Sequence, residues 1–231
     1  MKAKKAVKKE VKAVKVKAPA KKAAVTKKAA KAPLTSKPSK QLTAMPSPEI
    51  FRQELKIPKD RVGVLVGTKG AVKRHIEKTA NVKLDISHEG DVVISGRDTV
   101  MLYDVKIVIQ AIGRGFSPAI AFQLFNESAA FELLDITDYA GKSKKKMDRL
   151  RGRVIGENGR ARRSVEDLTE TAISVYGKTV GIIGDMEMAA LAREAVDMLL
   201  SGAPHGAVYR MLENKRREIH RHRLEAMGRI R

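Results

Sequence analysis

The sequence predicts an α+β protein in which one small module occurs twice, preceded by a basic tail and followed by a basic helix. Three observations support this fold class. Segments of strict apolar and polar alternation, typical of half-buried strands, are interleaved with segments whose apolar residues recur every three or four positions, typical of helices. The second half of the chain repeats the first at an offset of 89 residues. Residues 1–46 differ in composition from everything that follows.

The N-terminal tail, residues 1–46, is built mainly from Lys, Ala, Val and Pro. It holds 15 lysines, no arginine and a single acid, Glu10, and so carries +14 of the formal net charge of +21. Without aromatic residues or enough apolar surface to offset the entropy of ordering, we expect it to be disordered when free. Its lysines would then bind phosphates without reading sequence, unless the tail only aids solubility.

The charge of the whole chain points to a polyanion as partner, because 47 Lys and Arg face 26 acids and the pI is near 10.2. Nucleic acid is the first candidate. No apolar run approaches the roughly 20 residues that span a bilayer, so we expect a cytoplasmic protein with no membrane partner. The absence of cysteine excludes disulfides, zinc knuckles and thiol nucleophiles. The composition predicts no cofactor, no metal and no small-molecule substrate.

The first module is predicted over residues 47–115, in the order strand, helix, helix, strand, strand, helix. The predicted elements are an edge strand at 49–57, helices at 60–66 and 71–79, strands at 82–86 and 92–95, and a helix at 98–112. In the last helix, Met101, Val105, Val108 and Ile112 recur at three and four residues and predict the buried face.

An internal comparison predicts that the second half has the same fold. An offset of 89 aligns Gly67 and Gly70 with Gly156 and Gly159, and Leu84 with Ile173. After the loss of one residue in the hairpin, an offset of 88 aligns Gly96 with Gly184. A repeat of this length is a duplicated domain, since solenoid and propeller units have periods of roughly 20 to 50 residues.

The remaining segments follow from this repeat. The second module is expected over residues 130–202, after a linker at 116–129 that holds a short helix. Residues 203–231 are expected to form a basic amphipathic helix over 206–227. A third Gly-x-x-Gly pair, Gly181 and Gly184, lies inside an apolar, strand-like run and is interpreted as structural.

The two other Gly-x-x-Gly turns predict phosphate binding. A backbone can approach a phosphate closely only where no Cβ intervenes, and the helix that follows adds unpaired N–H groups and the positive end of its dipole. Nearby arginines and lysines add charge and hydrogen bonds. The predicted RNA-binding residues of the second module are Arg151, Arg153, Ile155, Gly156, Glu157, Asn158, Gly159, Arg160, Arg162, Arg163 and Ile173. Those of the first are Gly67, Thr68, Lys69, Gly70, Lys73 and Arg74.

These contacts position RNA without specifying its sequence. Bases are expected in an adjacent apolar groove lined by Val154, Ile155 and Val165, with the edge of Ile173–Ser174–Val175 offering backbone donors and acceptors. Both copies resemble the KH module, whose glycine loop clamps about four single-stranded nucleotides. The resemblance implies the type I order, with a three-stranded antiparallel sheet against three helices.

Three residues depart from the usual KH pattern. Lys73 and Arg162 occupy positions that are usually apolar, and Glu157 places a carboxylate in a loop that is often basic. The carboxylate should weaken phosphate binding, and the neighbouring arginines offset it. We favour the second module as the working clamp, because more arginine surrounds its turn.

The second module and the segment after it resemble a narrower family. The runs from Ile173 to Gly184 and from Gly202 to Arg210 are similar to the partner-of-Nob family of small-subunit ribosome assembly proteins, in its archaeal form. The resemblance covers about residues 47–225 and implies binding to single-stranded small-subunit pre-rRNA near its 3′ end. It also implies a Nob-type endonuclease and other assembly or initiation factors as partners.

Two alternatives remain. A general KH-type regulator, or an adaptor or scaffold for a nuclease, would share the glycine turns but not the C-terminal similarity. Catalysis needs a nucleophile, a base or a metal cluster at workable spacing. Asp135 and Asp138 are the nearest approach to paired carboxylates, while His220 and His222 are two residues apart and do not share a helical face. We therefore expect a non-catalytic protein.

Overall fold

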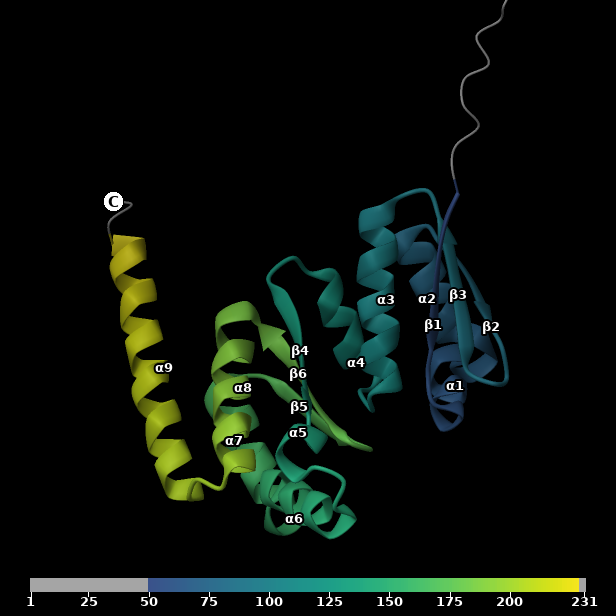
Figure 1. Ribbon diagram of the computed structural model, residues 1–231. Helices are drawn as coiled ribbons and strands as arrows, with labels where there is room; N and C mark the ends of the chain where they lie inside the picture. The colour runs from purple at the N-terminus through teal and green to yellow at the C-terminus, as the bar shows by residue number, and fades with distance from the viewer. Residues whose placement is uncertain (1–49, 229–231) are drawn as a thin grey trace, which may run out of the picture. The chain divides into compact units, whose positions relative to one another are not determined.

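The computed structural model describes residues 50–228. The predicted basic tail lies outside the described residues. Those residues belong to one compact unit, which contains the module twice (Figure 1). Each copy has a three-stranded antiparallel sheet and three principal helices, as the sequence predicted.

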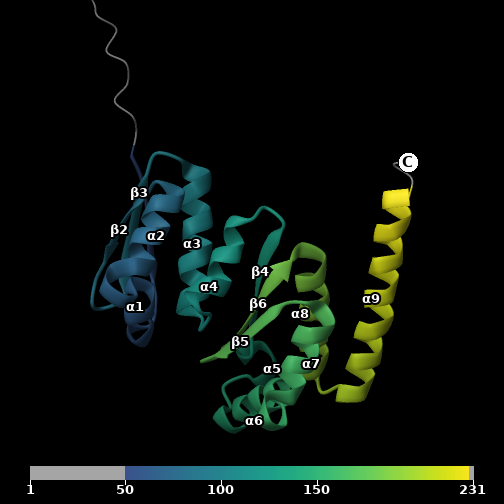
Figure 2. The same cartoon turned by 180° about the vertical axis from the view of Figure 1, so that it is seen from behind.

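The first module has the order β1 (Phe51–Lys56), α1 (Lys59–Val66), α2 (Ala71–Ala80), β2 (Lys83–Ile86), β3 (Asp91–Gly96) and α3 (Thr99–Gly113). Its sheet has the strand order β1-β3-β2. Leu84, Val92 and Ile94 are buried, whereas Lys83 and Asp91 are exposed. This alternation shows that the helices cover one face of the sheet (Figure 2).

The second module repeats this arrangement. Its elements are β4 (Ala129–Asp135), α5 (Thr137–Ala140), α6 (Lys144–Ile155), α7 (Arg160–Thr169), β5 (Ala172–Tyr176), β6 (Thr179–Asp185) and α8 (Met186–Ser201). The strand order is β4-β6-β5. Between the modules, α4 (Pro118–Ala121) and a 3₁₀ turn over Phe122–Phe125 form the predicted short helix.

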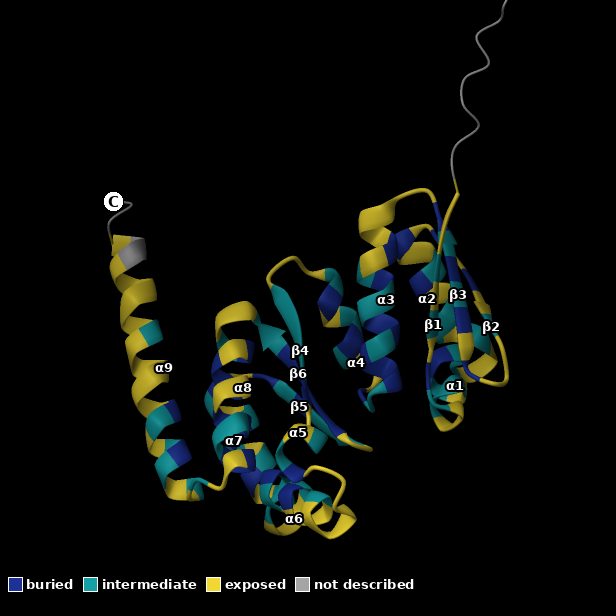
Figure 3. Ribbon diagram, viewed as in Figure 1, coloured by how far each residue is buried: buried dark blue, intermediate teal, exposed yellow. Residues whose placement is uncertain are grey.

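Strand β6 is buried on both faces, and this explains its continuous apolar run. Residues 179–183 are all buried (Figure 3). Helices α6 to α8 cover one face, and Ile183 belongs to a buried cluster with Phe116 on the other. A Cβ at Gly181 would lie 2.7 Å from the Phe116 ring. The glycine is therefore structural, as predicted, because the chain between the modules packs against it.

In each module, an arginine donates hydrogen bonds to two carbonyl oxygens, one in the last turn of the third long helix and one just after it. In the first, Arg61 donates to the carbonyl oxygens of Ile112 and Phe116, at 2.9 and 2.5 Å. In the second, Arg153 donates to those of Leu199 and Ala203, at 3.1 and 2.6 Å. Carbonyls at a helix C-terminus have no intrahelical partner, so the guanidinium fork satisfies them.

The predicted C-terminal helix is present as α9 (His205–Gly228), and it packs on the second module. Val208 and Leu212 are fully buried against that module. Two arginines form ion pairs with it: Arg216 with Glu170 at 2.6 Å, and Arg223 with Asp185 at 2.5 Å. Some of the positively charged side chains of α9 therefore hold this helix against the second module.

The predicted buried face of α3 was wrong at one residue. Met101 is 40% exposed, whereas its neighbour Leu102 is fully buried with Val105, Val108 and Ile112. Both neighbours are apolar, so periodicity could not decide between them. Packing onto β3 decides the rotation of the helix.

Candidate nucleic-acid interface

The two glycine turns have nearly the same backbone. Gly67 and Gly156 both have φ 72°, with ψ 176° and 177°. Gly70 and Gly159 both have φ 76°, in the left-handed region. The conformation of Gly67 and Gly156 is essentially restricted to glycine. Two turns with different middle residues thus adopt one shape, which only the glycines permit.

The two glycines of the second turn are needed for different reasons. A Cβ at Gly156 would lie 2.5 Å from the Cβ of Ala161 and 2.7 Å from its N atom, so any side chain would displace the start of α7. At Gly159, the nearest atom is Arg163 Nε at 3.9 Å. Gly156 therefore holds the turn against its own helix, and Gly159 leaves open space for a ligand.

The second turn is exposed and offers backbone N–H donors to a ligand. Glu157 and Asn158 are exposed, and α7 has no side-chain cap at its N-terminus. The Arg160 N–H donates to the Glu157 carbonyl oxygen, and the N–H groups that follow it in the first turn remain available to an anion, aided by the helix dipole. We call the turn Gly156–Gly159, the first turn of α7 and the free edge of β5 the second clamp surface. The first clamp surface comprises Gly67–Gly70, the first turn of α2 and the free edge of β2.

Four of the predicted arginines lie around the second clamp surface. Arg160 and Arg163 are exposed on the first turn of α7. Arg162 Nε lies 3.5 Å from Glu166 Oε2, and Arg151 Nη2 lies 3.1 Å from Asp148 Oδ1. The Nε atoms of Arg151 and Arg162 are buried without a hydrogen-bond partner among the described residues. The two side chains are 36% and 39% exposed, so the terminal N–H groups of their guanidinium groups can reach a ligand.

The predicted role of Arg153 changes. Its guanidinium is occupied by the two carbonyl oxygens at the end of α8, and its own carbonyl oxygen lies 2.9 Å from a ring nitrogen of His205. Arg151 and Arg153 are only two residues apart in the sequence, but side chains two residues apart on a helix point to different sides. We therefore assign Arg153 to the structure of the module.

This assignment predicts opposite results for two matched substitutions. Arg153→Met should lower the free energy of unfolding by about 1–2 kcal/mol, because two part-buried carbonyl oxygens lose their donors. It should leave RNA affinity little changed. Arg151→Met should weaken RNA binding and leave the thermal midpoint unchanged. Chemical denaturation and RNA titration of both variants check this, and a loss of RNA affinity in folded Arg153→Met alone would contradict it.

The predicted apolar groove is also revised. Val154 and Val165 are 1% exposed and Ile173 is 4% exposed, because these side chains fill the core of the module. Among the predicted lining residues of the groove, Ile155 remains half-buried at the surface. Helices α6 and α7 both contact β5, the edge strand of its sheet. Bases would therefore meet Ile155, charged side chains and the backbone edge.

The edge of β5 is partly occupied, which the sequence did not reveal. The N–H of Ile173 donates to Glu166 Oε1 at 2.8 Å. In the first module, the N–H of Leu84 donates to Glu77 Oε1 at 3.0 Å. Glu77 and Glu166 are 89 residues apart, so the internal repeat carried a signal for this contact.

The first clamp surface carries less unpaired charge near its turn. Thr68 and Lys69 are exposed. The Arg74 guanidinium donates to the carbonyl oxygen of Lys69 at 2.9 Å, and Lys73 Nζ lies 3.9 Å from Glu77 Oε1. Arg74 thus braces the turn itself. The first surface has the shape of a clamp with fewer free cations around it.

The carboxylates considered for catalysis have structural surroundings. Asp135 accepts hydrogen bonds from the hydroxyl and the N–H of Thr137, at 2.6 and 2.8 Å. These bonds lower the pKa of Asp135, the direction opposite to that of a general acid. The carboxylate holds the first residue of the short helix α5.

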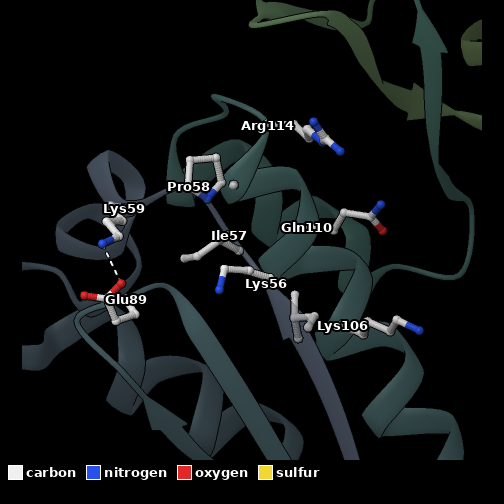
Figure 4. Close-up of a pocket in the computed structure, with 10 residues that line it drawn as sticks. Lys56, Ile57, Pro58, Lys59, Glu89, Lys106, Gln110 and Arg114 are labelled. Atoms are coloured by element: carbon white, nitrogen blue, oxygen red, sulfur yellow. Dashed lines mark ion pairs between the residues drawn. The ribbon is translucent and has the colours of Figure 1, made fainter. Parts of the chain in front are cut away.

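A cavity of about 530 Å³ lies at the opposite end of α1 from the glycine turn (Figure 4). Its lining includes four cations, Lys56, Lys59, Lys106 and Arg114. Lys56 pairs with Asp91 at 2.9 Å and Lys59 with Glu89 at 2.5 Å. Half of its cations are therefore neutralised by protein acids. Its residues come from distant parts of the sequence, so no local motif predicted it.

Comparisons with known proteins agree with this architecture. Residues 130–217 match the model of a eukaryotic-type KH domain, KH-domain type I, and residues 52–111 match the model of the KH domain. A KH domain-containing protein of Methanocaldococcus jannaschii is 49% identical over 175 residues, which cover 74% of this chain and 77% of that protein.

Two further relatives have informative names. The pre-rRNA-processing protein PNO1 of Chaetomium thermophilum is 32% identical over 83 residues, which cover 36% of this chain and 31% of that protein. The chain thus spans about a third of that relative. The Dim2p chain in a crystal structure of an a/eIF2alpha–aDim2p–rRNA complex from Pyrococcus horikoshii is 40% identical, with a TM-score of 0.68. The match covers 73% of this chain and 96% of that one.

Proposed function

We propose that this chain, which belongs to the PNO1/Dim2 family of KH-domain proteins, is an RNA-binding factor in the assembly of the small ribosomal subunit. The observation that carries the proposal is the second glycine turn. Gly156 has a backbone conformation that only glycine adopts readily. The turn leads into a helix that has no side-chain cap and is surrounded by arginines. That combination suits the sugar-phosphate chain of single-stranded RNA.

The proposed ligand is single-stranded pre-rRNA of the small subunit near its 3′ end. Support comes from relatives, since one is named for pre-rRNA processing and another was crystallised with rRNA. The same crystal structure contains a/eIF2alpha, which makes an initiation factor a candidate partner here. A Nob-type endonuclease is a second candidate partner. In this role the protein positions RNA in the cytoplasm and does not cut it.

The second clamp surface is the proposed working site, and the first one is its weaker copy. Arg151, Arg160, Arg162 and Arg163 surround the second turn, and the first has Lys69, Lys73 and Arg74, of which Arg74 is used by its own turn. No helix within residues 50–228 is long and apolar enough to cross a membrane. The proposal assigns the phosphates of single-stranded RNA to the second clamp surface.

Crosslinking in cells, followed by sequencing of the attached RNA, tests the proposed ligand. The expected result is a concentration of reads on the 3′ region of the small-subunit pre-rRNA. A variant with acidic residues in the second turn should lose these reads. Reads spread over messenger RNAs, or over other parts of rRNA, would favour a general KH regulator or nuclease adaptor instead.

Reversing the charge of the second turn should strengthen binding. Glu157 is exposed in the turn, where a phosphate would approach it. Glu157→Lys removes a repulsion and adds a cation, so the slope of log K against log salt should steepen by about 0.7 for one added phosphate contact. Salt titrations of RNA affinity measure this slope.

Glu194→Lys on α8 is the control for net charge, because it makes the same change at an exposed position outside the clamp surfaces. Equal slopes in the two variants would show that only the overall charge of the protein matters. The proposed site predicts a clearly larger change for Glu157→Lys.

A further inference from the structure

Each module contains the same charged pair beside its edge strand. In the first, Lys73 precedes Glu77 by one helical turn, and in the second, Arg162 precedes Glu166 in the same way. Both carboxylates accept the outward N–H of the edge strand, from Leu84 and Ile173. The pair thus occupies the region where a base in a KH module would meet the strand.

The pair changes what the edge of β5 offers to a base. In an antiparallel ladder, a residue whose N–H points away from the partner strand also points its C=O away. The Ile173 N–H is taken by Glu166 Oε1, so the edge offers at this residue only the Ile173 carbonyl oxygen. The second carboxylate oxygen, Oε2, adds another acceptor. The carboxylate that binds the Ile173 N–H thus leaves the edge with two acceptors and no donor at this residue.

Arg162 supplies the donor beside these acceptors. Its Nε lies 3.5 Å from Glu166 Oε2 and is buried, so the terminal N–H groups of the guanidinium are the donors that can reach a base. The side chain of Arg162 is 39% exposed and that of Glu166 is 22% exposed. The guanidinium can therefore donate outward, while the carboxylate is partly shielded from water, where unmatched polar groups cost more.

From this set of groups we propose that the second clamp surface selects guanine at the position beside Ile173. The Watson–Crick edge of guanine presents one acceptor, O6, and two neighbouring donors, N1–H and N2–H. These match the Arg162 guanidinium and the two acceptors. Uracil has one donor between two acceptors, and adenine and cytosine present a ring-nitrogen acceptor that a carboxylate repels. The inference rests on the proposed function, since it assigns a base preference to that RNA site.

The preference is tested by binding the full-length protein to a randomised single-stranded RNA library and sequencing the bound fraction. The wild type should enrich guanine at one position by about tenfold, the discrimination typical of a well-matched charged contact. Glu166→Gln keeps a carbonyl acceptor for the Ile173 N–H but replaces the second acceptor by an amide donor. It should lose the enrichment at that position only. Glu194→Gln, the same change at an exposed position of α8 outside both clamp surfaces, should leave the motif unchanged.

Other outcomes overturn the inference. A wild-type motif without guanine, or an unchanged guanine in Glu166→Gln, would contradict it. If Glu166→Gln enriches no motif at all, Arg162→Met decides: loss of guanine at that position supports the proposal, and its retention contradicts it. The proposed function fails separately, when the wild type enriches no motif or when acidic residues in the second turn leave its motif intact.

Discussion

Replacement of Glu157 and Asn158 by aspartate should reduce the affinity for single-stranded RNA at least about tenfold, which corresponds to about 1.4 kcal/mol. Glu157→Asp keeps the existing carboxylate and Asn158→Asp adds a second one, so one negative charge is added where the sugar-phosphate chain approaches the turn. Both side chains are exposed, so no packing is lost. Asn158 has φ 51°, in the left-handed region, which aspartate tolerates nearly as well as asparagine. The fold should therefore be unchanged.

Titration of a fluorescent single-stranded RNA measures the loss, and circular dichroism and the thermal midpoint confirm folding. The matched control is Thr68→Asp in the first turn, which has the same backbone and also adds one negative charge. We expect a smaller loss there, because fewer free cations surround that turn. Unchanged affinity in the folded second-turn variant would contradict the proposed site.

Gly181→Val should destabilise the second module by about 1–3 kcal/mol, the usual cost of overpacking a core. Strand propensity alone predicts the opposite, since valine favours strands and glycine weakens them. In the structure, steric overlap outweighs strand propensity, because a Cβ at Gly181 would lie 2.7 Å from the Phe116 ring and 3.3 Å from that of Phe131. The aligned residue of the first module, Val93, is half-buried and tolerates its side chain.

Chemical denaturation measures this effect, and two further variants make it specific. Gly63→Ala in α1 introduces a Cβ with no atom within 4 Å, and should stabilise the protein by about 0.5–1 kcal/mol. Phe116→Ala combined with Gly181→Val should cost less than the sum of the single changes, because the ring that clashes is gone. A stabilising effect of Gly181→Val would refute the packing explanation.

The sequence alone predicted the order of elements because its signals were local and occurred twice. Alternation identified strands, spacing identified helices, and the 89-residue offset carried assignments from one copy to the other. The glycine turns were predicted for the same reason, since their backbone depends on the glycines themselves. Their nearly identical φ and ψ values in two contexts indicate that the motif, and not its surroundings, fixes the turn.

The contacts of individual side chains could not be predicted from such signals. Arg151 and Arg153 had the same predicted role in RNA binding. In the structure, the position of Arg153 on its helix directs its side chain to the end of α8. Val154 and Val165 were expected to line a groove and instead fill the core. The paired glutamates were visible in the repeat, but their contact with an edge strand required the register of the sheet.

The structure also sets the design of variants at the turn itself. Substitution of Gly156 by aspartate would force a Cβ to within 2.5 Å of Ala161, so a loss of binding in such a variant could reflect a deformed turn. Gly159 has open space, and Glu157 and Asn158 are exposed. Charge placed at the middle residues therefore separates RNA contact from the folding of the turn.

Ultraviolet crosslinking of the full chain to single-stranded RNA, followed by identification of the modified tryptic peptides, tests the central claim most directly. Cleavage after Arg153, Arg160, Arg163 and Lys178 isolates the second turn in residues 154–160 and the edge strand in residues 164–178. The account predicts that nucleotides attach mainly to these two peptides. Attachment confined to the tail or to α9, with both peptides unmodified, would contradict it.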